Sequence, residues 1–422
     1  MSQQLRCKAP YSGRRRGVLC AVAATAAWTV AFSGSATAAT ITDPQSKQWY
    51  LDAMNAEKIW KSATGDGVTV AVIDGGVNPS TPSLRGQVLK GVDFTGVKGE
   101  ASDDLDGHGT SMAELIAGTG KGGGLKGLAP GAKILPFRVS DTELQNKERV
   151  NAFDMQQAIR AAADSDAKII NISLAGDYYS SEVRDAVEYA QMKGKLLFAG
   201  AGNNAKKGNK EQYPASYPEA IAVAGSGPDG KVADYSQHGD TIDIAAPADD
   251  IPGWCDQSFT NYCDGDGGTS SATAIASATA ALIWSKHPDW TGNQVLRVMF
   301  ESAGRGKDWE PGSVSRYLGH GIVRPGAHIN RGLGKPGDPD ITPLTNERVG
   351  PPQASKAPSA PASSQPKEGG KPGSDAVAAG SSKDAAKQSD GDGTSVLVIG
   401  AVAAVAVLAG AAYAIVRRRR TA

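Results

Sequence analysis

The chain has 422 residues and an apolar fraction of 40%, enough to bury the core of one large domain or of two ordinary ones. Its 44 basic and 44 acidic residues cancel, but the charges are unevenly distributed. Five basic residues lie before Gly17 and four after Val416, so the part between them is acidic on balance. Nucleic-acid binding requires clustered Lys and Arg on the folded part, so this distribution argues against nucleic acid as a partner.

The first segment has the pattern of a secretory leader. Basic residues come first, an apolar stretch follows at about 17–32, and small residues end in Ala36-Thr37-Ala38. We therefore expect residues 1–38 to be a signal peptide that is removed before Ala39. An uncleaved membrane anchor is the alternative, and the Arg-Arg pair before Gly17 allows twin-arginine export as well as the general route.

Residues 39–333 alternate short β-branched runs with helical patterns. The runs are continuously hydrophobic, which is typical of strands buried on both faces. The expected strands are 68–74, 132–139, 167–174, 195–201 and 220–226, and the expected helices are 108–117, 152–163, 183–193 and 270–286. This order predicts one α/β domain with a mainly parallel sheet covered by helices. Sites in such folds lie at the carboxyl ends of the strands, and Asp74 ends the first strand.

Two cysteines, Cys7 and Cys20, lie in the expected leader. The remaining pair, Cys255 and Cys263, would face an oxidising compartment, which favours a disulfide over the alternative of two free thiols. The bond would close the loop just before Ser270.

The composition changes to Pro, Ser, Ala, Gly and Lys at 334–394, with almost no large apolar residue. Such a segment cannot bury enough surface to offset its ordering entropy, so we expect a disordered tether. A charge-free apolar run at 395–416 precedes a basic tail at 417–422. This pattern predicts a single transmembrane helix, with the large domain outside the cell membrane and the tail in the cytoplasm. A buried core helix is the alternative.

Three short motifs contain the candidate catalytic residues: AVIDGGVN around Asp74, DGHGTSMAELIAG around His108 and GDGGTSSATAIASA around Ser270. Taken singly, each is explained by a turn, a surface loop or a helix cap. Together, in the order Asp, His, Ser, they match one of the recurring serine triads. A serine hydroxyl is a weak nucleophile, so a histidine must take its proton and a buried carboxylate must orient that histidine. This chemistry predicts Ser270 as nucleophile, His108 as general base and acid, and Asp74 as its partner.

The oxygen of the tetrahedral intermediate also needs hydrogen-bond donors. The N–H of Ser270 at a helix start is one, and the side-chain amide of Asn203 is the expected second, with Asn204 as the alternative. A metal hydrolase is another alternative, but the five histidines include no His-Glu-x-x-His pattern, so we expect no catalytic metal. We also expect no cofactor. We interpret the acidic stretch DDLDG, which contains Asp104, as a solvating and orienting segment near His108, and structural calcium stays open.

These motifs, together with QWYLDAMNAEKIW, GLAPGAKILPFRV, AKIINISLAG, YPASYPEAIAVAG and GHGIVRPGAHIN, make residues 48–330 resemble a subtilase. The resemblance implies the subtilisin-like three-layer α/β/α fold and a serine endopeptidase that cleaves proteins and peptides. It also implies that Ser173, Leu174 and Ala175 form one wall of the pocket for the substrate residue before the cleaved bond. Ala175 stands where glycine is usual, which would narrow that pocket, and Ala274 stands where proline is usual.

The order of leader, short extension, subtilase domain, tether, membrane helix and basic tail resembles the mycosins, the membrane-anchored subtilases of type VII secretion systems. That resemblance implies processing of secreted substrates and contact with subunits of the secretion membrane complex. About ten residues separate the leader from Gln48, too few for an inhibitory pro-domain, so we expect no activation by its removal. A stand-alone cell-surface subtilase and a scaffold subunit with secondary catalysis are the alternatives.

Overall fold

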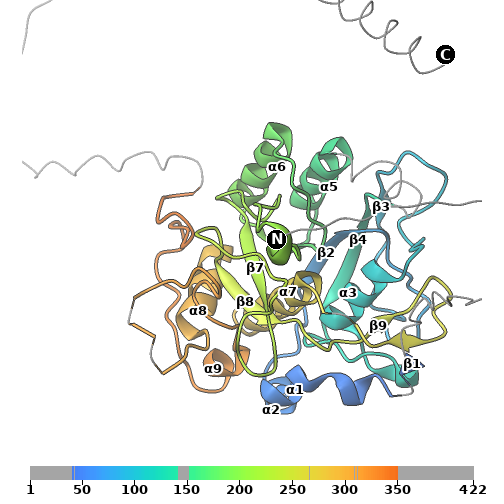
Figure 1. Ribbon diagram of the computed structural model, residues 1–422, viewed down its shortest axis with the longest axis horizontal. Coiled ribbons are helices and arrows are strands. Elements are labelled where there is room, and N and C mark those ends of the chain that lie inside the picture. Colours follow the sequence, from blue (N-terminus) through green and yellow to red (C-terminus); the bar gives the residue numbers. More distant parts are fainter. Residues whose placement is uncertain are drawn as a thin grey trace, which may run out of the picture. The chain divides into compact units, whose positions relative to one another are not determined.

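The computed structural model describes residues 40–41, 43–140, 152–265, 267–307, 309–310 and 312–349 (Figure 1). The expected signal peptide, the tether beyond residue 349, the membrane helix and the basic tail lie outside these residues. Across the described ranges, no helix is both long enough and apolar enough to cross a membrane.

A seven-stranded sheet forms the centre of the domain, and all of its neighbouring strands are parallel. In spatial order the strands are β3 (Val92–Asp93), β4 (Lys133–Arg138), β2 (Thr69–Asp74), β5 (Ile169–Ile172), β6 (Leu196–Gly200), β7 (Ile221–Ser226) and β8 (Ile244–Pro247). The predicted parallel α/β sheet is confirmed. The sequence pattern predicts only the other five, because β3 has two residues and β8, with the sequence IAAP, contains a single β-branched residue.

Helices cover both faces of this sheet. One face packs against α5 (Ala152–Asp164) and α6 (Ser181–Met192). The other packs against α3 (His108–Ala117), α7 (Thr269–Lys286) and α8 (Gly292–Ser302), with α1 (Trp49–Ala53), α2 (Ala56–Trp60) and α9 (Pro325–Ile329) outside them. Successive side chains of a strand point to opposite faces of the sheet, so each face has its own apolar core. In β2, Val70 and Val72 are part of the core beneath α7, and Ala71 and Ile73 are part of the core beneath α5. Three short 3₁₀ helices cover Gln45–Lys47, Lys121–Gly123 and Ala205–Lys207.

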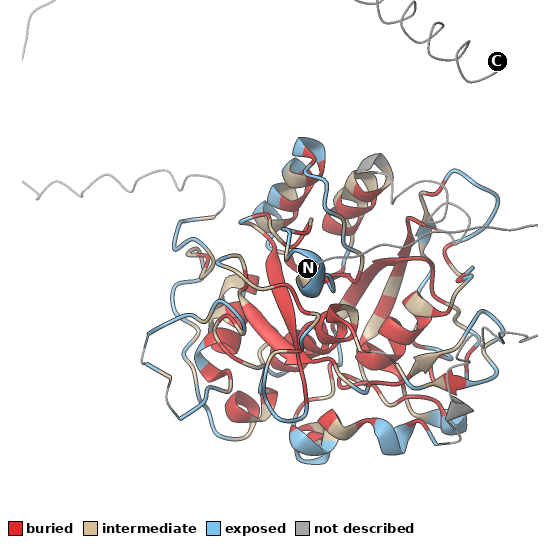
Figure 2. Ribbon diagram, in the orientation of Figure 1, coloured by how far each residue is buried: buried red, intermediate tan, exposed pale blue. Residues whose placement is uncertain are grey.

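The helix α7 runs through the core, and every residue at 271–284 is buried (Figure 2). A helix that is surrounded by protein on all sides needs apolar or small side chains all round, and this one is built mainly of Ala, Ser and Thr. The hydroxyls of Thr273 and Thr279 donate to the carbonyls of Thr269 and Ile275, at 2.6 and 2.9 Å, so they are buried with partners.

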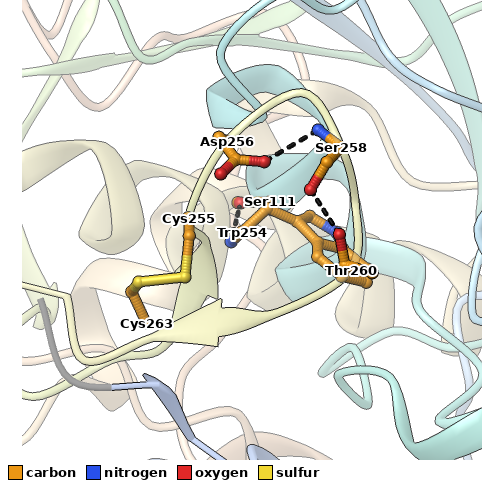
Figure 3. The surroundings of a disulfide bond; sticks show 7 residues. All are labelled: Ser111, Trp254, Cys255, Asp256, Ser258, Thr260 and Cys263. Atoms are coloured by element: carbon orange, nitrogen blue, oxygen red, sulfur yellow. Dashed lines mark hydrogen bonds between the residues drawn. A yellow bond between two sulfur atoms is a disulfide. The ribbon is translucent and has the colours of Figure 1, made fainter.

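A second, small sheet lies beside α3. Its three antiparallel strands are, in order, β1 (Thr40–Ile41), β10 (Tyr262–Cys263) and β9 (Gly253–Trp254). A disulfide joins Cys255 to Cys263, with the two sulfur atoms 2.03 Å apart, and closes the loop between β9 and β10 (Figure 3).

The packed domain continues beyond Leu333, where the composition predicts that it ends. The N–H of Lys335 donates to the carboxylate of Glu301 at 2.8 Å, and Arg297 Nη2 donates to the carbonyl of Ile341 at 3.1 Å. Thr342 is 1% exposed. Residues 334–349 therefore pack on α8, and the predicted start of the tether at 334 is too early. Polar side chains on α8 hold this segment by its backbone, which leaves no hydrophobic pattern in its sequence.

Candidate active site

The candidate residues come together at one edge of the large sheet. Asp74 is the last residue of β2, while Ser173 and Asn203 follow the ends of β5 and β6. Because the strands are parallel, their carboxyl ends lie at the same edge. His108 is the first residue of α3 and Ser270 lies in the first turn of α7, so both are presented by helix N-termini.

Asp74 and His108 are in direct contact. The Oδ1 of Asp74 lies 2.8 Å from the Nδ1 of His108 and also accepts the N–H of Gly75 at 2.8 Å. The carboxylate is buried, whereas 35% of the histidine side chain is exposed. Since a carboxylate can only accept, Nδ1 carries the proton in this pair, and in the neutral form of the imidazole Nε2 keeps the free lone pair. Within the described residues Nε2 has no hydrogen-bond partner, so it is open to a reacting group.

The surroundings of His108 stabilise its cation. Burial disfavours the imidazolium, but the charge and hydrogen bond of Asp74, with weaker contributions from Asp106 and Asp104, raise the pKa of His108 to about 9. A histidine that must accept a proton during a reaction gains from such an environment, because the carboxylate stabilises the charge that forms.

The turn that leads into His108 is organised by the acidic stretch before it. Asp104 accepts the N–H of Gly107 at 2.9 Å, and its other oxygen accepts the N–H of Thr110 at 2.8 Å and the hydroxyl of the same residue. Asp106 accepts the N–H of His108 at 2.9 Å. These carboxylates satisfy N–H groups that a helix start leaves unpaired. Among the described residues, no three His, Cys, Asp or Glu side chains are grouped so that they could hold a metal ion.

Gly109 allows α3 to approach β2. A Cβ at this position would lie 2.1 Å from the carbonyl oxygen of Gly76 and 3.1 Å from the Cβ of Asp74. Any larger residue would push the helix away from the strand, and with it the imidazole of His108 away from Asp74. The glycine after the histidine in DGHGT is therefore required by packing.

Ser270 is joined to the strand β5 and not to His108. Its hydroxyl donates to the carbonyl of Ser173 at 3.0 Å, and the hydroxyl of Ser173 donates back to the carbonyl of Ser270 at 3.2 Å. In the described part of the chain no hydrogen bond links Ser270 to His108. The structure thus brings Asp74 and His108 together and places Ser270 against Ser173.

A buried polar network that the sequence analysis missed lies beneath Ser173. The amide of Asn171 donates to the hydroxyl of Ser173 at 3.0 Å, and its oxygen accepts the hydroxyl of Ser277 in α7 at 3.0 Å. Asn171 is 0% exposed. A lone asparagine inside the apolar run AKIINISL was the signal for it, because a buried amide requires partners from elsewhere in the fold.

The side chain of Asn203 is oriented by Thr269. Its Oδ1 accepts the N–H and the hydroxyl of Thr269, at 2.9 and 3.0 Å, which directs the amide nitrogen to the opposite side. A Cβ on Gly268 would lie 3.5 Å from that nitrogen and 3.8 Å from the backbone nitrogen of Ser270. Two donors therefore approach one point beside Gly268. The alternative, Asn204, lines the neighbouring cavity, and its N–H donates to Gln237 at 2.7 Å.

A cavity of about 580 Å³ lies beside Asn204, the residue that follows Asn203 in the chain. Leu174 and Ala175 are part of its wall, whereas Ser173 is not. The rest of the lining combines apolar and aromatic residues with polar and charged ones. The first group includes Met155, Val183, Tyr213, Pro214 and Tyr217, and the second includes Asp177, Lys207 and Lys210. Such a cavity suits an apolar side chain of a bound chain.

Residues 65–321 match the model of the Subtilase family, Peptidase_S8. Thermitase of Thermoactinomyces vulgaris is 33% identical over 280 residues, which are 64% of this chain and 95% of thermitase. Subtilisin E of Bacillus subtilis is 34% identical over 238 residues, 55% of this chain and 59% of that protein. The chain therefore spans less than two thirds of the length of subtilisin E.

Similar solved structures include mycosin-type proteases. MycP1 from Mycobacterium smegmatis has 26% identity and a TM-score of 0.59, and the likeness covers 69% of this chain and 87% of MycP1. Another MycP1 structure, described as a serine protease and an essential component of the type VII (ESX-1) secretion system, has 30% identity and a TM-score of 0.58. That match covers 69% of this chain and 91% of the MycP1 chain.

Proposed function

Because the chain belongs to the subtilase family and is a serine endopeptidase, we propose that Asp74, His108 and Ser270 are its catalytic triad. The observation that carries this proposal is the 2.8 Å contact between Asp74 and the Nδ1 of His108, which leaves Nε2 free at the edge of the sheet where α7 begins. The order of the three residues along the chain and their family match support the same assignment.

In the reaction we propose, the Ser270 hydroxyl first leaves the carbonyl of Ser173 by rotating about its Cα–Cβ bond. It then donates to the Nε2 of His108, which takes the proton as the oxygen attacks the carbonyl carbon of the substrate. The imidazolium later gives that proton to the leaving amine. Asp74 keeps the ring in the correct tautomer and stabilises its charge throughout. Water repeats the sequence to release the acyl group.

The developing oxyanion would lie beside Gly268, where the amide nitrogen of Asn203 and the backbone nitrogen of Ser270 lie near each other. A single donor of this kind is worth about 3 kcal/mol in the transition state. We also propose that Leu174 and Ala175 contact the substrate residue before the cleaved bond, since they line the adjacent cavity. Ser173 would complete that wall with its backbone and, through its carbonyl, hold the resting Ser270 hydroxyl.

The test of this assignment is hydrolysis of a peptide library by wild type, Ser270→Ala and His108→Ala, with thermal unfolding of each protein as the control. Both variants should lose turnover. Ser270→Ala should keep the unfolding temperature, because it removes one partly exposed hydroxyl, whereas His108→Ala should lower it, because the buried carboxylate of Asp74 loses its partner. A folded Ser270→Ala protein that still hydrolyses peptides would overturn the triad.

We further propose that the protein is held on the outer face of the cell membrane by residues 395–416 and serves a type VII secretion complex, where it processes secreted proteins. The apolar run before four arginines supports the anchor, and the likeness to MycP1 supports the role. A tag placed after Thr421 should be protected from added protease in intact cells while the large domain is cut. An accessible tag would contradict the topology. Purification of the membrane complex without secretion subunits would favour a stand-alone cell-surface protease.

A further inference from the structure

The disulfide-closed hairpin at residues 253–263 lies on the first turn of α3, the turn that begins with His108. Figure 3 shows Trp254 at the base of this hairpin with its backbone nitrogen facing Ser111 of α3. That N–H donates to the Ser111 hydroxyl at 2.8 Å. The same hydroxyl donates to the carbonyl of Gly107 at 2.6 Å. Ser111 therefore connects the hairpin to the peptide group that directly precedes His108.

The hairpin also touches Gly107 directly. A Cβ on Gly107 would lie 2.9 Å from the Cβ of Trp254 and 3.3 Å from the carbonyl oxygen of Asp256. Gly107 has a φ of 82°, the left-handed conformation that favours glycine. On its other side, its N–H is bonded to Asp104 at 2.9 Å. The residue before the catalytic histidine is thus fixed between the acidic turn and the hairpin.

A second attachment lies further along α3. The hydroxyl of Tyr262 in β10 donates to the carboxylate of Glu114 at 2.6 Å. The ring of Tyr262 stacks on the ring of Trp254, with centroids 3.8 Å apart. Trp254 and Tyr262 directly precede Cys255 and Cys263, so the disulfide joins the chain next to both points at which the hairpin holds α3.

We propose that this hairpin is a positioning element for His108, and that the Cys255–Cys263 disulfide keeps Trp254 against Gly107 so that the imidazole stays aimed at Ser270. Ser111 is the positioning residue that transmits the effect. The proposal rests on the triad assignment above. Opening the disulfide frees the residues between the cysteines to move, and a misplacement of about 1 Å at a reacting group costs up to about 10²-fold in rate.

The test compares the double variant Cys255→Ala/Cys263→Ala and the single variant Ser111→Ala with wild type, in steady-state peptide hydrolysis from pH 5 to 10. We expect kcat to fall between about 10-fold and about 10²-fold in both variants, since 10²-fold is the loss that a misplacement of about 1 Å causes. KM should change less than about twofold. The midpoint of kcat/KM against pH should shift toward the ordinary histidine value, because the contact of His108 with Asp74 becomes looser. A merely structural role would leave that midpoint unchanged.

Ser258→Ala is the matched control, since Ser258 lies at the exposed tip of the hairpin and, among the described residues, forms hydrogen bonds to Asp256 and Thr260 within the hairpin alone. Its kcat should equal that of wild type. Dithiothreitol gives a second control: it transfers two electrons and two protons to the disulfide, forms two thiols and closes to its own cyclic disulfide. Wild type should slow reversibly, and the double cysteine variant should not respond.

The proposal would be overturned if both the double cysteine variant and Ser111→Ala had the kcat and the pH midpoint of wild type, or if their only change were in KM. If circular dichroism shows the double variant unfolded, Ser111→Ala alone decides on the same criteria. Failure of the triad would be recognised separately, as hydrolysis by Ser270→Ala. Failure of the positioning role alone would give full activity in the double cysteine variant and in Ser111→Ala, while Ser270→Ala is inactive.

Discussion

Glu114 is a buried carboxylate in the helix that carries His108, and it should make folding stability depend on pH. Its side chain is 0% exposed and accepts hydrogen bonds from the hydroxyls of Thr81 and Tyr262, at 2.8 and 2.6 Å. Burial outweighs these bonds and raises the pKa of Glu114 from 4.5 to about 7. A group whose pKa is higher in the folded state contributes stability below its unfolded pKa and loses that contribution as pH rises through the folded pKa.

The change from 4.5 to about 7 corresponds to a free-energy difference of about 3 kcal/mol. We therefore expect wild type to lose up to about 3 kcal/mol of unfolding free energy between pH 4 and pH 8, relative to Glu114→Gln. The glutamine has the same shape and stays neutral, and its amide can bond to both hydroxyls.

The assay is urea unfolding at several pH values, with Ser270→Ala as the background in both proteins so that self-digestion does not interfere. Other titrating groups cancel in the difference between the two proteins. A difference that stays constant from pH 4 to pH 8, or that changes in favour of wild type as pH rises, would refute the assigned burial cost of Glu114.

Three further predictions concern the catalytic residues. Asp74→Asn should lower kcat about 10⁴-fold, because the amide no longer fixes the Nδ1–H tautomer of His108, and a loss below tenfold in peptide hydrolysis would contradict this. Wild-type kcat/KM should rise with pH and reach half of its maximum between pH 6.5 and about 9, since His108 must be neutral to act as a base and its pKa is raised. A midpoint below pH 6.5 would show that Asp74 does not stabilise the imidazolium of His108. Asn203→Ala should lower kcat about 10²- to 10³-fold with little change in KM, and Asn204→Ala should not; the reverse result would move the oxyanion role to Asn204.

The sheet and its main helices could be predicted from the sequence because their residues carry a local pattern. The strand β2 begins at Thr69 and ends at Asp74, one residue inside the predicted range, since a strand buried on both faces is apolar along its whole length. The helix α7 was expected from Ser270 and begins at Thr269. The small sheet of β1, β9 and β10 has no such pattern, because its strands have two residues each, and β1 pairs with β10 more than 200 residues further along the chain.

The contacts around the site could likewise be predicted only where a local sequence pattern encodes them. The motifs place Asp74 and His108 at the ends of elements that meet, and the structure joins them. The bond from Ser270 to Ser173 spans 97 residues and depends on how α7 lies across β5, which no local pattern encodes. The contact between Ser111 and Trp254 spans 143 residues, and Ser111 looks like any small residue of α3. Such partners became visible only with the packed structure.

Ser270 as the activated nucleophile is tested most directly by a fluorophosphonate, which reacts with a serine whose hydroxyl is activated by a neighbouring base. Mass spectrometry of the digested protein should find one adduct, on the peptide that contains Ser270, with hydrolytic activity lost in proportion to labelling. His108→Ala should not be labelled, because its serine lacks the base. An adduct on another serine, or full peptide hydrolysis by a protein that carries the label on Ser270, would contradict the assignment.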